Sequence, residues 1–230
     1  METTTKSAPA SRRASQSKTH QIVITAMLVA LSFLAVLIGR LIPNVAGFLS
    51  YDPKDAIVAI GGFIYGPITA VIVSVLCSVI EMLTISSTGV YGLIMNIVST
   101  CAFAVPAAII YKRIHSMKGA IIGLAAGMIC MTLMMLLWNY IITPFYMGVD
   151  RSVVAGMLAS VFLPFNLIKS GINAGLTLLL YKPLIGALRA ARLVPQSSGG
   201  KSGFKATYMI LGVVVLITFV LLFLVLIGVL

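Results

Sequence analysis

Four polar side chains lie close together inside a long apolar stretch, residues 161–182. They are Asn166, Lys169, Ser170 and Asn173, and their spacing of i, i+3, i+4 and i+7 places them on one face of a helix. The stretch is long and apolar enough to cross a bilayer as a helix. An ionisable group inside a spanning helix is costly and usually faces the protein interior or a wet cavity. The pattern therefore predicts a polar stripe that lines a ligand pocket.

The composition says what kind of protein must position this stripe. Of the 230 residues, 60% are hydrophobic and 9% are charged, far less charge than a soluble domain carries. Backbone groups in lipid must be hydrogen-bonded within each segment, so we expect an all-α polytopic membrane protein. The net charge of +11 comes from basic residues in short loops and tails. Membrane orientation explains that placement better than nucleic-acid binding does.

The hydrophobic runs predict a six-helix bundle plus an additional C-terminal transmembrane helix. One run, 56–84, is divided in two because Gly66-Pro67 interrupts it. The predicted helices are 22–41, 55–65, 67–84, 91–111, 119–142, 157–181 and 208–229. We expect four regions: a disordered basic cytoplasmic tail at 1–19, a six-helix membrane domain at 20–192, a cytoplasmic linker at 193–206 and the extra transmembrane helix at 207–230.

The loop charges test this division. If the tail is cytoplasmic, the basic loop 112–118 must be cytoplasmic too, and four crossings must precede it. Counting 56–84 as two segments gives four crossings and places most of the sixteen Lys and Arg residues inside. The N-terminus is then cytoplasmic and the C-terminus outside, in a multi-pass protein of the cell membrane.

In this topology the polar side chains form one layer near the outer surface. The loop 43–51 is apolar but broken by Pro and Gly, which suits a lid over a membrane pocket. The predicted ligand-binding residues of this layer are Asn44, Tyr51, Asp52, Asn96, Asn139, Asn166, Lys169 and Asn173. Amides both donate and accept hydrogen bonds, so they suit a neutral ligand with hydroxyl or imide groups. The aromatic residues available to face a flat ring are Tyr51, Trp138, Tyr140, Phe145 and Phe165.

Two points in this layer remain open at the level of sequence. The partner of Lys169 is a carboxylate, with Glu81 or Asp52 as candidates, or a ligand oxygen. Each Asn could also be only an interhelical hydrogen bond, worth about 1 kcal/mol or less. A face that combines three polar residues with a Lys favours the pocket.

Enzyme chemistry is not indicated. The segment Gly199-Gly200-Lys201-Ser202 looks like the end of a phosphate-binding loop, but Pro195 stands where its first Gly belongs and no strand precedes it. No His/Glu metal pair and no nucleophile motif occurs. We therefore expect a non-enzymatic protein without an ATPase site of its own, a bound metal or a cofactor.

Several motifs together resemble a known family. They are Tyr51-Asp-Pro-Lys-Asp55, Gly61-Gly-Phe-Ile-Tyr-Gly-Pro67, Met95-Asn96, Trp138-Asn-Tyr140 and Leu163-Pro-Phe-Asn-Leu-Ile-Lys169. With them, the region of about 20–192 resembles the riboflavin-specific substrate-binding (S) component of energy-coupling-factor (ECF) vitamin transporters.

The resemblance implies a function and partners. An S component binds its vitamin from outside and docks on a transmembrane T component that two cytoplasmic ATPase subunits drive. Asn139, Asn166 and Lys169 would then hydrogen-bond riboflavin, and the loop from Asn44 through Val45 and Ala46 to Asp52 would close over it. The small residues Ala26 and Ala30, which share one helix face, would dock on the T component. The last helix departs from the six-helix pattern.

Two alternatives remain. The chain could be an S component for another vitamin, or it could be a self-sufficient secondary carrier that needs no ATPase partner.

Overall fold

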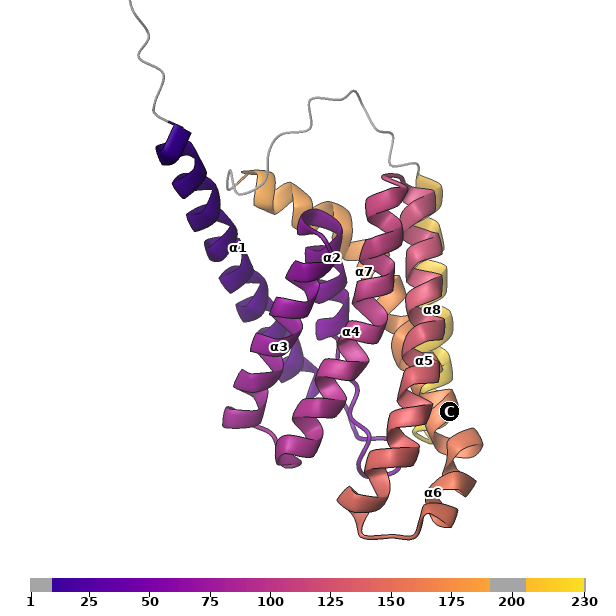
Figure 1. Ribbon diagram of the computed structural model, residues 1–230. Coiled ribbons are helices and arrows are strands. Elements are labelled where there is room, and N and C mark those ends of the chain that lie inside the picture. The colour runs from indigo at the N-terminus through magenta and orange to yellow at the C-terminus, as the bar shows by residue number, and fades with distance from the viewer. Residues whose placement is uncertain (1–9, 191–205, 230) are drawn as a thin grey trace, which may run out of the picture.

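The computed structural model describes residues 10–190 and 206–229, and in these ranges the chain is almost entirely helical (Figure 1). The π-helical turn η1 (Leu158–Phe162) joins two of the helices. The helices are α1 (Ala10–Gly39), α2 (Lys54–Tyr65), α3 (Pro67–Thr84), α4 (Gly89–Arg113), α5 (Met117–Met147), α6 (Arg151–Met157), α7 (Leu163–Ala190) and α8 (Ala206–Leu226).

The division of the long apolar run is confirmed. α2 ends at Tyr65 and α3 begins at Pro67. Between them Gly66 has φ 94, a conformation that favours glycine, and Pro67 occupies the first helical position, where its missing N–H costs nothing. α2 has 12 residues, fewer than a full span needs, and nearly all of them are buried among the other helices, as a short crossing segment requires.

The remaining helices make this a multi-pass membrane protein. In the described ranges, six helical segments are long and apolar enough to span a membrane, and α2 is not one of them. α8 confirms the predicted helix after the six-helix bundle. The predicted fold class, an all-α bundle with one extra C-terminal helix, is therefore correct.

Three helices differ most from their predicted bounds. α1 begins at Ala10, so the tail expected to be disordered through residue 19 is helical from that point; the Ala, Arg, Gln and Lys residues there favour continuation of the helix. α5 continues to Met147, because Pro144 lies in its last turn and does not stop it. α7 begins at Leu163, after η1 and α6, and continues to Ala190, whereas the predicted helix ends at residue 181. Residues 1–9 and most of the predicted linker lie outside the described residues.

α4 and α5 pack closely against each other. A Cβ added at Gly123 would lie 2.7 Å from the carbonyl oxygen of Ala107, and one at Gly127 would lie 2.3 Å from that of Phe103. Only glycine permits such an approach between backbones. The main apolar core surrounds this contact and includes Leu28, Phe103 and Met131.

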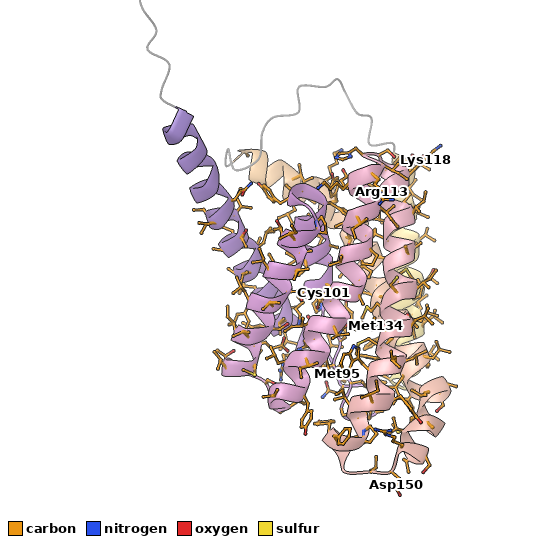
Figure 2. All side chains as sticks on the ribbon, in the orientation of Figure 1. Met95, Cys101, Arg113, Lys118, Met134 and Asp150 are labelled. Atoms are coloured by element: carbon orange, nitrogen blue, oxygen red, sulfur yellow. The ribbon has the colours of Figure 1, made fainter. Side chains whose placement is uncertain are left out.

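The two ends of the bundle differ in charge. Arg113 and Lys118 lie at the end where α1 begins, which we call the basic end (Figure 2). Asp150 and the C-terminus lie at the opposite end, which we call the cavity end (Figures 1 and 2). The start of α1 and the loop 112–118 thus share one end of the bundle, as the count of four crossings requires.

Candidate ligand-binding site

A cavity of about 380 Å³ opens at the cavity end. Its walls come from the loop between α1 and α2, the loop between α3 and α4, and the facing sides of α4, α5 and α7. The volume is within the range of small-molecule sites. Of the residues predicted to bind a ligand, those that line it are Asn44, Tyr51, Asp52, Asn96, Asn139, Asn166 and Lys169.

Two buried amides occupy facing walls of the cavity. Asn139 on α5 is 2% exposed and Asn166 on α7 is 1% exposed. Each donates one N–H to the carbonyl oxygen four residues earlier in its own helix, at 2.7 Å to Met135 and 2.8 Å to Phe162. These bonds fix the side chains within their own helices, so neither amide links two helices among residues 10–190 and 206–229, as the sequence had left open. An amide NH₂ group has two N–H donors, so each side chain has a second N–H besides the one that bonds to its own helix.

The partner of Lys169 is a carboxylate that the sequence did not single out. Its Nζ lies 3.9 Å from Oδ2 of Asp55, on α2. Asp55 is fully buried, and its Oδ1 accepts a hydrogen bond of 2.6 Å from the Thr100 hydroxyl. Neither Glu81 nor Asp52 forms an ion pair with Lys169 among the described residues. The expectation of Glu81 or Asp52 is wrong because α2 turns Asp55, one residue beyond Lys54, towards α7.

Glu81 and Asp52 instead hold another cation. The Nζ of Lys54 lies 2.9 Å from Oε2 of Glu81 and forms an ion pair with Asp52. Arg40, at the end of α1, lies 3.8 Å from Glu81. With Asp55 and Lys169, these side chains make a cluster of three carboxylates and three cations, and the chain has only five acidic residues in all. A buried charge is costly unless it is paired, so the equal numbers make this cluster tolerable.

The surrounding charges and burial determine the protonation states of two loop side chains, Tyr51 and Asp52. Burial, together with the nearby carboxylates of Asp55 and Asp52, raises the pKa of Tyr51, so its hydroxyl stays protonated. Burial alone would raise the pKa of Asp52 as well, but the ammonium groups of Lys54 and Lys169 outweigh it and hold that pKa below its usual range. Tyr51 is therefore a donor and Asp52 an anion at neutral pH.

Three of the predicted ligand-binding residues do not line the cavity. Asn173 is fully buried behind it, where it accepts a hydrogen bond from the Tyr51 hydroxyl at 3.0 Å and donates to Asp55 and to the Asp52 carbonyl. Val45 is buried on the side of the loop that packs towards α7 and α8. Ala46 is exposed at the tip of the loop, with φ 51. These three residues are close in sequence to cavity residues, but their side chains point in other directions and do not reach the cavity.

The aromatic lining also differs from the expectation. Tyr51 and Phe165 face the cavity as predicted, but Trp138, Tyr140 and Phe145 do not line it. The other aromatic rings that line the cavity are Phe48 from the lid loop, Tyr91 from α4 and Tyr146 from the last turn of α5. The cavity therefore combines amides, charges and aromatic faces.

Comparison with known proteins assigns the family. The model of the family "ECF transporter, substrate-specific component" matches residues 20–181, which is more than half of the chain. The chain is an ECF transporter S component. The match ends before α8 begins, so α8 lies beyond the family region of this S component.

Curated relatives and a solved structure agree with this assignment. The S component is 28% identical to "Riboflavin transporter FmnP" of Bacillus subtilis, over 76% of this chain and 99% of that protein. It is 27% identical to "Riboflavin transporter RibU" of Staphylococcus aureus, over 77% of this chain and 97% of that protein. A solved structure described as the S component of a bacterial ECF transporter superimposes with a TM-score of 0.64 at 27% identity, covering 75% of this chain and 99% of that one.

Sequence reasoning missed Arg40, which lines the cavity, and Asp55, which lies beside it as the partner of Lys169. Arg40 follows the last turn of the first span, where a charge is common and indicates no particular role. The motif Asp52-Pro53-Lys54-Asp55 predicts a helix start that includes Asp55. At that helix start, Asp52 Oδ1 accepts from the Lys54 N–H at 3.1 Å, and the N-cap position is Pro53. Three charges in four residues before an apolar helix could have indicated a buried ionic cluster.

The predicted docking residues lie on the outside of the bundle. Ala26 and Ala30 are both exposed, whereas Ile24, Leu28 and Ser32 on the same helix are buried against the other helices. Packing against the described part of the chain therefore does not account for this pair.

Proposed function

We propose that this S component binds riboflavin in the cavity from the outside and passes it to an ECF T component driven by partner ATPases. The observation that carries the proposal is the meeting of Asn139, Asn166 and Lys169 on one cavity walled by aromatic rings. A flavin has a flat ring system whose one edge alternates N–H and carbonyl groups, and amides match such an edge because they donate and accept.

The ring faces and the ribityl chain find suitable partners in the same cavity. Phe48, Tyr91, Tyr146 and Phe165 provide apolar faces for the flavin ring system. Asn44, Asn96 and the Ser86–Thr88 loop provide polar groups for a chain of hydroxyls. That the curated relatives are named riboflavin transporters supports the choice of riboflavin over other vitamins.

The proposed partners follow from the family and from the exposed helix face. ECF transporters combine an S component with a T component and ATPase subunits, and we propose that Ala26 and Ala30 allow a T-component helix to approach α1 closely. The basic end is then cytoplasmic, in agreement with the positive-inside rule, and the cavity opens to the outside. The energy for release comes from the partner ATPases, and we propose no ATPase site in this chain; the segment 199–202 lies outside the described residues.

Titration of the purified protein with riboflavin tests the proposal. Trp138 is the single tryptophan, and its fluorescence should be quenched saturably by bound flavin, with a submicromolar dissociation constant. Thiamin, biotin and pantothenate should not compete. Folded protein that shows no saturable quenching would reject riboflavin, and competition by another vitamin would name that vitamin in its place.

A transport assay separates the S component from a self-sufficient carrier. Proteoliposomes that hold this chain alone should bind riboflavin but should not accumulate it in response to an ion gradient. Accumulation by the chain alone would mean that it needs no ATPase partner.

A further inference from the structure

The helix beyond the family region packs against α7 along a face built for close approach. Gly171 and Gly175 stand four residues apart on α7, and such pairs let membrane helices approach each other closely. A Cβ at Gly171 would lie 2.5 Å from ring atoms of Phe219, and one at Gly175 would lie 3.0 Å from the backbone of Leu216. α8 is therefore part of the packed structure, and its position along α7 is fixed by these contacts.

The same face of α8 continues onto the lid loop. Phe223 is 6% exposed, and its ring centroid lies 5.9 Å from that of Tyr51. The two rings belong to a small apolar cluster separate from the main core, which joins the loop, α7 and α8. Its buried members are Val45, Tyr51, Phe165, Ile168, Ile172 and Phe223.

Tyr51 connects this cluster to the polar side of the cavity. Its hydroxyl donates to Oδ1 of Asn173 at 3.0 Å, and Nδ2 of Asn173 donates to Oδ2 of Asp55 at 3.2 Å. The same Asp55 oxygen lies 3.9 Å from Nζ of Lys169. A continuous series of contacts therefore runs from Phe223, outside the family region, to a cation that lines the cavity.

The loop depends on contacts outside itself for its position. Within the loop, the backbone groups of Val45 and Leu49 pair at 2.8 and 3.0 Å, the Phe48 N–H donates to the Val45 carbonyl at 3.3 Å, and Ser50 Oγ donates to Asn44 Oδ1 at 2.9 Å. Residues such as Gly47, Phe48 and Ser50 line the cavity. Ala46 adopts a left-handed conformation that an L-residue adopts at a cost. A loop with so few bonds of its own is held by what it packs against.

We propose that α8 acts as a clamp, in which Phe223 holds Tyr51 and with it the loop 42–51 closed over the cavity, so that ligand exchange is slowed. The proposal rests on the proposed function only for the choice of riboflavin as the ligand. Phe223 does not line the cavity and acts through Tyr51, which does, so it is a positioning residue. It determines how often the loop opens, and it therefore changes the rates of ligand association and dissociation.

Stopped-flow measurement of riboflavin association and dissociation with the full chain tests the clamp. Removing the ring contact in Phe223→Ala should speed both association and dissociation by about three- to tenfold, with a smaller change in the dissociation constant. A merely structural role would lower the fraction of binding-competent protein and leave the two rates of the remaining fraction unchanged. Phe223→Leu, which keeps apolar volume, should show a smaller effect and remains informative if Phe223→Ala does not fold.

Two further variants make the test specific. Leu222→Ala alters the neighbouring residue on the same helix, which is 46% exposed, and should leave both rates as in the wild type. In a Tyr51→Ala background, Phe223→Ala should add nothing, because its partner is already absent. Unchanged rates in Phe223→Ala and Phe223→Leu, an equal change in Leu222→Ala, or an undiminished effect without Tyr51 would each overturn the proposal.

Hydrogen exchange of the ligand-free protein separates failure of the clamp from failure of the proposed function. The backbone N–H groups of Val45 and Leu49 should exchange about three- to tenfold faster in Phe223→Ala than in the wild type or Leu222→Ala. If the wild type does not bind riboflavin but this difference is present, the ligand is wrong and the clamp stands. If the exchange is unchanged, the clamp is rejected whether or not riboflavin binds.

Discussion

The cavity end and the basic end of the bundle use the same charged residue types in opposite ways. At the cavity end, Lys54 and Lys169 are buried and paired with carboxylates, and Arg40 completes the balance of three cations and three anions. At the basic end, Arg113 and Lys118 are exposed (Figure 2). Buried pairs fix a geometry because each member needs its partner, whereas exposed charges in a short loop act through their sign.

The difference shows which charges the fold depends on. Removal of Lys54 from the cavity cluster would leave the buried carboxylates of Asp52 and Glu81 without the cation that they share. A charge in the loop 112–118 can be removed at little cost to stability. Matched substitutions at the two ends should therefore separate these roles, with effects that range from a large loss of stability to a small local change.

Removal of the central cation of the cluster should have the largest effect. Lys54→Met leaves Asp52 and Glu81 without their shared partner, and we expect the free energy of unfolding to fall by about 3–5 kcal/mol. Lys118→Met, at the basic end, should change it by less than about 0.5 kcal/mol. Thermal unfolding of both variants in the same detergent measures the contrast. Similar stability losses at the two ends would contradict the account of the cluster.

Removal of one cavity amide should have the next largest effect, on binding. Asn166→Ala or Asn139→Ala should weaken riboflavin binding by about 10- to 100-fold, because a polar group of the bound ligand loses its partner. The control at the basic end is Tyr111→Phe, which breaks the 2.5 Å contact between the hydroxyls of Tyr111 and Tyr181. It should leave the affinity unchanged. Fluorescence titration gives both values, and an equal loss in the control would mean that binding responds to general loosening of the bundle.

Substitutions that change only local backbone strain or helix capping should have the smallest effects on the free energy of unfolding. Ala46→Gly removes the cost of a left-handed alanine in the lid loop and should raise the free energy of unfolding by up to about 1 kcal/mol. Ser116→Ala removes the N-cap oxygen that accepts from the Gly119 N–H at 3.2 Å and should lower it by about 1 kcal/mol without a change in affinity. Calorimetry of both variants checks the signs; a loss of stability in Ala46→Gly would show that the left-handed conformation costs nothing there.

The helices were predictable because their signals, the apolar runs and the break at Gly66-Pro67, lie within each segment of the sequence. The stripe on α7 was predictable for the same reason: Asn166, Lys169 and Asn173 are all buried on one face, as the helical period requires. Which carboxylate meets Lys169 was not predictable, since Asp55 reaches it only through the packing of α2 between α4 and α7. The same holds for Asn173, whose partners lie about 120 residues away in sequence.

The most direct test of the central claim is the visible absorption spectrum of the purified protein before and after added riboflavin is removed by gel filtration. The claim is that Asn139 and Asn166 face a cavity that holds a flavin. The wild type should retain one flavin per chain and be yellow, whereas Asn139→Ala combined with Asn166→Ala should be folded and colourless, with Lys118→Met as a yellow control. A colourless wild type, or a double variant that retains its flavin, would contradict the claim.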